Sequence, residues 1–183
     1  MPTPFQIQIA HSTAHRPIRD VLSGMVFKGP GLLPQLLAMA LDTTDKNHHK
    51  ACWTLELVME AHIEWLTPYL DEFCNTLATY KQEGALRSVA KICLFTVGHH
   101  QTYPDFLNTS HTGLITAACF DWLINPNGKV ATKAYAMRAL FIIGKKEDWI
   151  YPELQRILSE DFVKHSAGYK AAAKDLLKRM ATP

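Results

Sequence analysis

Residues 129–144 read K-V-A-T-K-A-Y-A-M-R-A-L-F-I-I-G, and this stretch decides the fold class. It predicts one uninterrupted helix, and Gly144 stands where helices commonly end. Ala136, Leu140 and Ile143 recur at positions i, i+4 and i+7, and a second apolar row runs beside them. An apolar face this broad needs neighbours on two or three sides. The stretch therefore predicts a helix packed among several other helices.

The length and composition fit one soluble globular domain. The chain has 183 residues, 48% of them hydrophobic and 20% charged, which is enough for a sizeable core. No apolar run is long enough to cross a bilayer, and the first residues lack the pattern of a secretory signal. The formal charge of +2 is too small to imply nucleic-acid binding by itself.

The cysteines indicate a reducing compartment. None belongs to a C-x-x-C pair, and each lies inside an apolar helical pattern: Cys52, Cys74, Cys93 and Cys119. Such residues behave as small buried hydrophobic groups rather than as a disulfide framework. We therefore expect a cytoplasmic protein.

The order of elements predicts an N-terminal segment, residues 1–29, followed by one helical domain, residues 30–183. In residues 1–15, Phe5, Ile7 and Ile9 alternate with glutamines, which favours an extended arm. Helices are expected at 16–27, 32–41, 49–65, 68–80, 84–97, 111–124, 130–143, 151–158 and 167–180. Within this series, Thr67 and Pro68 are expected to start the fourth helix.

The helices repeat a common design. When alternate helices are aligned, Lys50, Arg87, Lys133 and Lys170 share one column, and Leu57, Leu94, Leu140 and Leu177 share another seven residues later. Among the intervening helices, Leu36, Leu70, Leu114 and Leu154 correspond, and they lie 34, 44 and 40 residues apart. Self-similarity at this period is typical of stacked helical hairpins.

In K-A-Y-A-M-R-A-L-F-I-I-G and R-S-V-A-K-I-C-L-F-T-V-G the chain resembles the second helix of the HEAT repeat family. The resemblance covers residues 30–180. It implies an all-α fold, a right-handed α–α superhelix of about four helical hairpins. The repeat lengths are uneven, and Asn127 stands where the family expects an acidic turn residue. The family includes scaffolds, adaptors and a few enzymes, so the resemblance alone implies no activity.

The motifs of common enzymes and metal sites do not occur in the sequence. There is no G-x-S-x-G, phosphate-binding loop, G-x-G-x-x-G or H-E-x-x-H pattern, so no catalytic residue and no cofactor is predicted. His48 and Cys52 are four residues apart, which would place two metal ligands on one helical face, but the pattern of a complete site is missing. A Cys–His nucleophilic pair is open on composition, although each cysteine occupies a core position. We predict that the protein is not an enzyme and holds no metal.

Charge predicts the binding surface. Arg87, Lys91, Lys133, Lys170 and Lys174 fall on the second helices of successive hairpins, which line the concave face of a helical solenoid. Helices stacked about 10 Å apart would align these residues as a basic stripe. We expect this stripe to bind a protein or peptide partner of acidic character. The competing interpretation is that these charges only keep the protein soluble.

Two further hypotheses remain open from the sequence. Nucleic-acid binding or processing through the same basic face is the alternative function, since DNA-alkylation-repair glycosylases are built from similar helices. No aromatic and carboxylate pocket of that kind can be placed on this sequence. Residues 98–110 form the longest predicted loop, with His99, His100 and Tyr103, and long loops on rigid scaffolds often carry function. A plain insertion is the competing explanation.

Overall fold

The computed structural model describes residues 1–161 and 166–181 of the chain. Within these residues every regular element is helical, which confirms the prediction of an all-α fold. The chain divides into two compact units, Met1–Ile92 (unit 1) and Cys93–Pro183 (unit 2). The division falls inside one helix, α6, so its first half belongs to unit 1 and its second half to unit 2.

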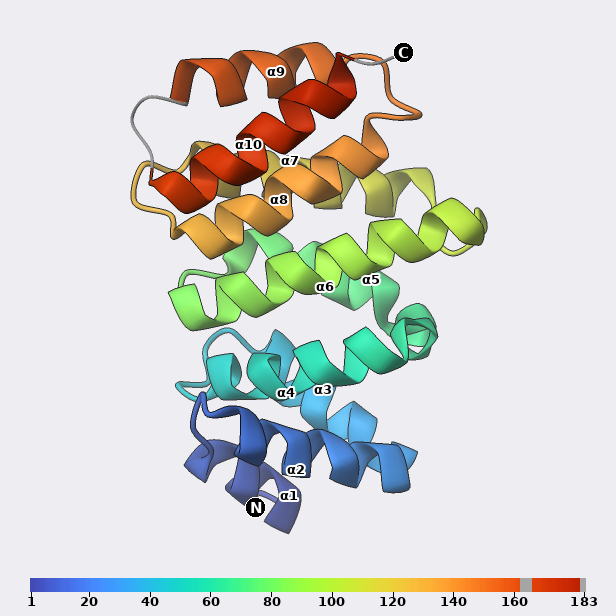
Figure 1. The fold of residues 1–183 in the computed structure, drawn as a ribbon. Coiled ribbons are helices and arrows are strands. Elements are labelled where there is room, and N and C mark those ends of the chain that lie inside the picture. The colour runs from blue at the N-terminus through green and yellow to red at the C-terminus, as the bar shows by residue number, and fades with distance from the viewer. Residues whose placement is uncertain (162–165, 182–183) are drawn as a thin grey trace. The chain divides into compact units, whose positions relative to one another are not determined.

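Unit 1 is built around helix α4. Helices α2 and α3 pack along α4, and α1 contacts both α3 and α4 (Figure 1). Its elements are α1 (Pro4–His11), α2 (Arg16–Lys28), η1 (Pro30–Leu32), α3 (Leu33–Leu41), α4 (His48–Ala61), η2 (Ile63–Tyr69), α5 (Leu70–Thr76), η3 (Leu77–Thr79) and the first half of α6 (Glu83–Thr102). The core of α4 is densely apolar, with Ala51, Cys52 and Val58 fully buried.

The predicted N-terminal arm is a helix, so the expectation of an extended segment is wrong. Thr3 and Gln6 form a reciprocal cap, in which each side chain accepts a hydrogen bond from the other residue's backbone N–H. Phe5 and Ile9, one turn apart, are both buried, whereas Ile7 is 45% exposed. The alternation of apolar residues with glutamines therefore did not mark a strand. The capping pair and the i, i+4 spacing decide the structure.

Two other predicted helix boundaries, the start at Thr67 and the end at Gly98, differ from those in the structure. Thr67 does not cap a helix, because its hydroxyl donates to the carbonyl of Glu64 inside the 3₁₀ segment η2, and Pro68 lies within that segment. Helix α6 does not end at Gly98 but continues to Thr102. A glycine inside a helix costs only about 1 kcal/mol relative to alanine, and the neighbouring Val97 is buried, so packing outweighs this preference.

Unit 2 is built around helix α8, the stretch 130–143. Helix α8 packs against α7, α9 and α10, which confirms the prediction of neighbours on several sides (Figure 1). The elements after α6 are α7 (Thr109–Ile124), α8 (Val130–Ile143), α9 (Ile150–Asp161) and α10 (Ala167–Met180). Ala136 and Leu140 are fully buried. Gly144 is the C-cap of α8, and close packing favours glycine there, since a Cβ would lie 2.3 Å from the Tyr151 ring.

The helices differ in length and hydropathy from a membrane span. Among the described residues, no single helix is long and apolar enough to cross a bilayer. The pair Arg16–Lys28 and Pro30–Leu41 reaches the required length and hydropathy only when its two helices are joined, and these are bent by 112° at their junction.

Candidate functional site

The first predicted stripe residue, Lys133, lies in the interior of unit 2. Its side chain is 1% exposed, and its Cε lies 3.3 Å from the position that a Cβ on Gly128 would take. The long methylene stem of a lysine readily packs along apolar surface in this way. Lys133 is therefore unavailable to a partner on the surface. The other residues of its aligned column, Lys50, Arg87 and Lys170, are half-buried.

Two other predicted stripe residues, Arg87 and Lys91, belong to a charge cluster in unit 1. The centre of this cluster is Glu56 on α4, which is 2% exposed. Its carboxylate accepts a hydrogen bond of 2.6 Å from the Ser88 hydroxyl and lies 3.2 Å from Lys91, 3.3 Å from Arg19 and 3.7 Å from Arg87. The cluster joins α2, α4 and α6.

The cations around Glu56 keep its carboxylate ionised. Burial by itself raises the pKa of Glu56, but the Ser88 hydroxyl and the three neighbouring cations outweigh burial and lower the pKa below its ordinary value. Arg19 also donates two hydrogen bonds, of 3.1 and 2.8 Å, to the Trp53 carbonyl. Lys91 contacts a second acid, Glu60, at 3.2 Å. Arg87 and Lys91 therefore serve contacts between helices of unit 1.

The last two predicted stripe residues, Lys170 and Lys174, lie on α10 in unit 2. Helix α10 runs beside α8 (Figure 1), which carries the exposed Arg138. Lys174 is exposed and Lys170 is half-buried. Among the described residues, no acid forms an ion pair with Arg138, Lys170 or Lys174. Lys170 and Lys174 are thus the stripe residues that form no ion pair with a described residue, and Arg138 on α8 shares this property.

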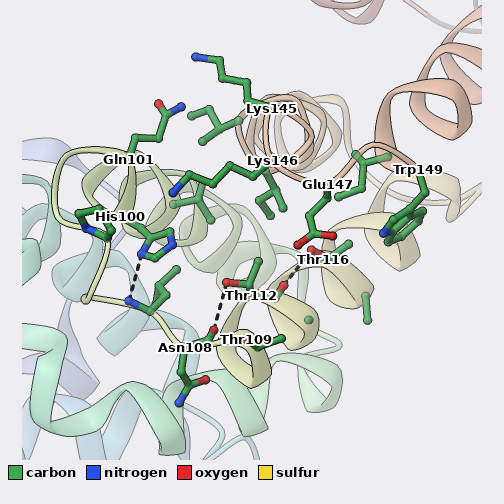
Figure 2. A pocket seen from close by; sticks show the side chains of 18 of the residues that line it. His100, Gln101, Asn108, Thr109, Thr112, Thr116, Lys145, Lys146, Glu147 and Trp149 are labelled. Carbon is green, nitrogen blue, oxygen red and sulfur yellow. Dashed lines mark hydrogen bonds between the residues drawn. The ribbon is translucent and has the colours of Figure 1, made fainter.

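Unit 2 also contains a pocket that the sequence did not predict. It has a volume of about 950 Å³ and lies between α7, the end of α6, the loop 103–108 and the loop 144–149 (Figure 2). The predicted loop 98–110 contributes to it, although only residues 103–108 lie outside the helices. His99 and His100 belong to the last turn of α6.

One side of the pocket is a face of α7 with small side chains. The residues on this face recur at helical spacing, and they are Thr109, Thr112, Gly113, Thr116, Ala117 and Phe120. A Cβ on Gly113 would meet nothing within 4 Å, so this position opens directly into the pocket. The floor is apolar, with the buried residues Val97, Ile143 and Ile150. Besides the loop 98–110, this helical spacing of small residues is a signal from which the pocket could have been inferred.

The polar end of the pocket is formed by His100 and Lys146. The side chain of Lys146 extends along the pocket toward His100 (Figure 2). The Leu107 N–H donates to His100 Nδ1 at 3.2 Å, so the other ring nitrogen, Nε2, carries the proton of the neutral ring. Burial and the charge of Lys146 lower the pKa of His100, which keeps the ring neutral near pH 7. This end thus offers a cation and a neutral N–H donor.

The other end of the pocket is aromatic. Trp149, which is 57% exposed, stacks on Phe120 with ring centroids 5.7 Å apart. Beyond this pair the apolar surface continues into a second hollow of about 630 Å³, which includes Ile124 and Pro152. Ile124 is 55% exposed. Large exposed apolar side chains that adjoin one another often mark an interaction surface.

The predicted metal and nucleophile residues occupy other surroundings. His48 Nδ1 contacts the Asp45 carbonyl at 2.7 Å, and the Cys52 thiol donates to the Ala40 carbonyl at 3.6 Å. Burial raises the pKa of Cys52 to about 12, so this thiol is protonated at neutral pH. Within residues 1–161 and 166–181, no three His, Cys, Asp or Glu side chains lie close enough to hold a metal ion.

Comparison with known proteins places these observations in a family. A family model for the HEAT repeat domain matches residues 6–180, which includes most of helix α1 as well as the region of the resemblance. Comparison with curated proteins gave no match, and comparison with solved structures gave none either.

Proposed function

Because the chain belongs to the HEAT repeat family, whose members generally serve as scaffolds for protein interactions, we propose that it is a non-enzymatic module whose unit 2 pocket holds a segment of a protein partner. The observation that carries this proposal is the pocket itself, with its apolar floor, its aromatic end and its few polar groups. Its volume of about 950 Å³ is in the range of sites that bury most of a bound ligand.

The proposal includes a cytoplasmic location. The buried cysteines support this location, because burial raises the pKa of both Cys52 and Cys74 to about 12 and neither is in a disulfide. Thiols of this kind act as small core residues, which suits a reducing compartment. Localisation of a tagged chain in its native cell tests this part of the proposal.

Filling the pocket tests the proposed function. In the variant Gly113→Trp the indole would occupy the open space beside α7 without replacing any packed side chain. We expect this variant to fold normally and to lose partners that the unchanged protein captures from a lysate of its native cell. Quantitative mass spectrometry of the two captured sets measures the loss.

Gly24→Trp is the matched control. Gly24 is also a helical glycine where an added Cβ would meet nothing within 4 Å, but it lies on α2 in unit 1. Partners that bind through the pocket should be retained by Gly24→Trp and lost by Gly113→Trp. If the two variants capture the same set as the unchanged protein, the pocket is not the binding site and the proposal is wrong.

A second candidate function is nucleic-acid binding through α8 and α10. Arg138, Lys170 and Lys174 support this alternative, since none is paired with an acid among the described residues. Binding to phosphates weakens steeply as salt concentration rises, whereas binding in the mixed pocket should weaken less. Titration of a labelled DNA or RNA oligonucleotide at several salt concentrations, with Lys174→Glu for comparison, decides between the two.

A further inference from the structure

We infer, on the basis of the proposed function, that the pocket of unit 2 recognises an extended peptide segment with a carboxylate and a large apolar side chain four or five residues apart. The carboxylate would lie between Lys146 and His100, and the apolar side chain would pack on Trp149 and Phe120. This inference names the chemistry of the partner, which the proposed function leaves open.

The polar end of the pocket selects a carboxylate. Lys146 supplies a positive charge, and Figure 2 shows its side chain directed along the pocket toward His100. His100 supplies an N–H donor, because its Nδ1 already accepts from the Leu107 N–H. Two donors, one of them charged, at the same end form stronger hydrogen bonds with an anion than with a neutral acceptor.

The aromatic end selects a large apolar side chain. Trp149 is 57% exposed although it is stacked on Phe120, so one side of this aromatic pair faces solvent. Aromatic side chains at such positions supply most of the contact area when a partner's apolar side chain covers them. Leucine, isoleucine, phenylalanine and tryptophan are the residues that would remove most apolar surface from water here.

The part of α7 that lines the pocket gives the length of segment that the pocket accommodates. Thr109 and Phe120 both line the pocket and are eleven residues apart on α7, which is about 16 Å at the rise of an α-helix. An extended chain advances about 3.3 Å per residue, so about five residues cover this length. The two recognised side chains should therefore lie four or five positions apart.

Polar groups on the rim favour an extended backbone over a helix. An extended segment leaves its own N–H and C=O groups unpaired, and they need partners when the segment is buried. Gln101 and Asn108 line the pocket and carry side-chain amides on opposite sides of its rim (Figure 2). The Oδ1 atom of Asn108 accepts from the His111 N–H, and this leaves the Nδ2 group to donate to a bound backbone.

Glu147 restricts where the acid can lie. Its carboxylate points toward Thr116, near the middle of the α7 face (Figure 2). An acidic residue in the middle of the bound segment would be repelled by Glu147, whereas one at the Lys146 end would be attracted. The pocket thus favours a segment with its acid at one end and neutral or basic residues in its centre.

The test is selection of peptides from a random octapeptide phage library on the full-length protein. We expect the selected peptides to carry Asp or Glu four or five positions from Leu, Ile, Phe or Trp. For one selected peptide, Lys146→Glu should weaken binding about 10- to 100-fold, the range expected for loss of a charged hydrogen bond. A selection repeated on Lys146→Glu should yield Lys or Arg in place of the acid.

Lys145→Glu is the matched control. Lys145 precedes Lys146 and also lines the pocket, but its side chain is not directed toward His100 as that of Lys146 is (Figure 2), and its Nζ lies 5.8 Å from the centre of the Phe141 ring. This variant makes the same charge change and should leave the affinity within about twofold of the unchanged protein, as exposed charges contribute little. An equal loss in both variants would indicate a general charge effect and overturn the inference.

The remaining outcomes separate the inference from the proposed function. Peptides that bind without an acid, and that Gly113→Trp no longer binds, would overturn the carboxylate inference and leave the pocket as a peptide site. Peptides that bind Gly113→Trp as well as the unchanged protein, or a library without any enrichment, would count against the proposed function itself.

Discussion

Several basic residues of the two units have different surroundings. In unit 1, Arg87 and Lys91 surround the buried carboxylate of Glu56, so their charges hold helices together. In unit 2, Arg138 and Lys174 are exposed and form no ion pair with the described residues, while Lys146 points along an open pocket. In these cases the surroundings of a basic residue depend on whether an acid lies on the adjacent helix.

Reversing the charge of Lys133 should have the largest effect on stability. Because this side chain is 1% exposed, Lys133→Glu would bury an anion where the fold accommodates a cation. We expect a loss of about 3–5 kcal/mol in the free energy of unfolding, measured with urea. Lys174→Glu, at an exposed position on α10, should change stability by no more than about 0.5 kcal/mol. Equal effects would show that Lys133 is exposed in solution.

Removing the charge of Glu56 should have the next largest effect. Glu56→Gln keeps the shape of the side chain but leaves Arg19, which is largely buried, without its anion. We expect a loss of about 3 kcal/mol in the free energy of unfolding at pH 7. Glu60→Gln is the control, because this acid is exposed and its contact with the cluster is the ion pair with Lys91. A loss below about 1 kcal/mol for Glu56→Gln would refute a cohesive role for the cluster.

The same carboxylate predicts how stability changes in acid. The pKa of Glu56 is lower in the folded protein than in the unfolded chain, where a glutamate titrates near about 4.3. Its contribution to stability is therefore complete above the unfolded pKa and is lost as the pH falls through the folded pKa. Urea unfolding between about pH 3 and pH 6 should show a steeper acid limb for the unchanged protein than for Glu56→Gln. Parallel limbs would contradict the prediction.

The smallest expected effect on stability comes from replacing a helical glycine with alanine, once in each unit. Gly113→Ala and Gly24→Ala should each stabilise the protein by about 0.5–1 kcal/mol, because both positions are helical and open to an added methyl group. Only the methyl on Gly113 would enter the pocket, so only Gly113→Ala should weaken binding of a selected peptide, by a few-fold. Thermal unfolding and peptide titration measure the two quantities. Weaker binding by both variants would contradict a site confined to the pocket.

Helices with strong periodicity could be predicted from the sequence almost to the residue. Helix α8 and helix α10 have the predicted bounds, 130–143 and 167–180. In these segments the spacing of apolar residues and the small residues agree with one another, so local preference and tertiary packing favour the same structure. The family assignment followed from the same stretches and is confirmed by the match over residues 6–180.

Segments with conflicting signals could not be predicted in this way. Helix α1 is not predicted because Phe5, Ile7 and Ile9 also alternate as in a strand. The Thr3–Gln6 cap and the burial of Phe5 and Ile9 distinguish the two patterns. The predicted end of helix α6, Val97, lies five residues before the observed end, Thr102, because Gly98 resembles a terminal glycine. A glycine stops a helix only when the following residues gain more from another conformation.

By itself, the sequence determined that this protein is helical, that its helices repeat and that it is a HEAT repeat protein, because these properties depend on spacing along the chain. The tertiary structure decided which lysines are exposed and where a pocket lies. Lys133 is buried, Lys91 is paired with Glu56, and the pocket gathers Lys146 and Trp149 beside α7. Such properties arise between helices, where the burial of a charge depends on neighbours that are distant in sequence.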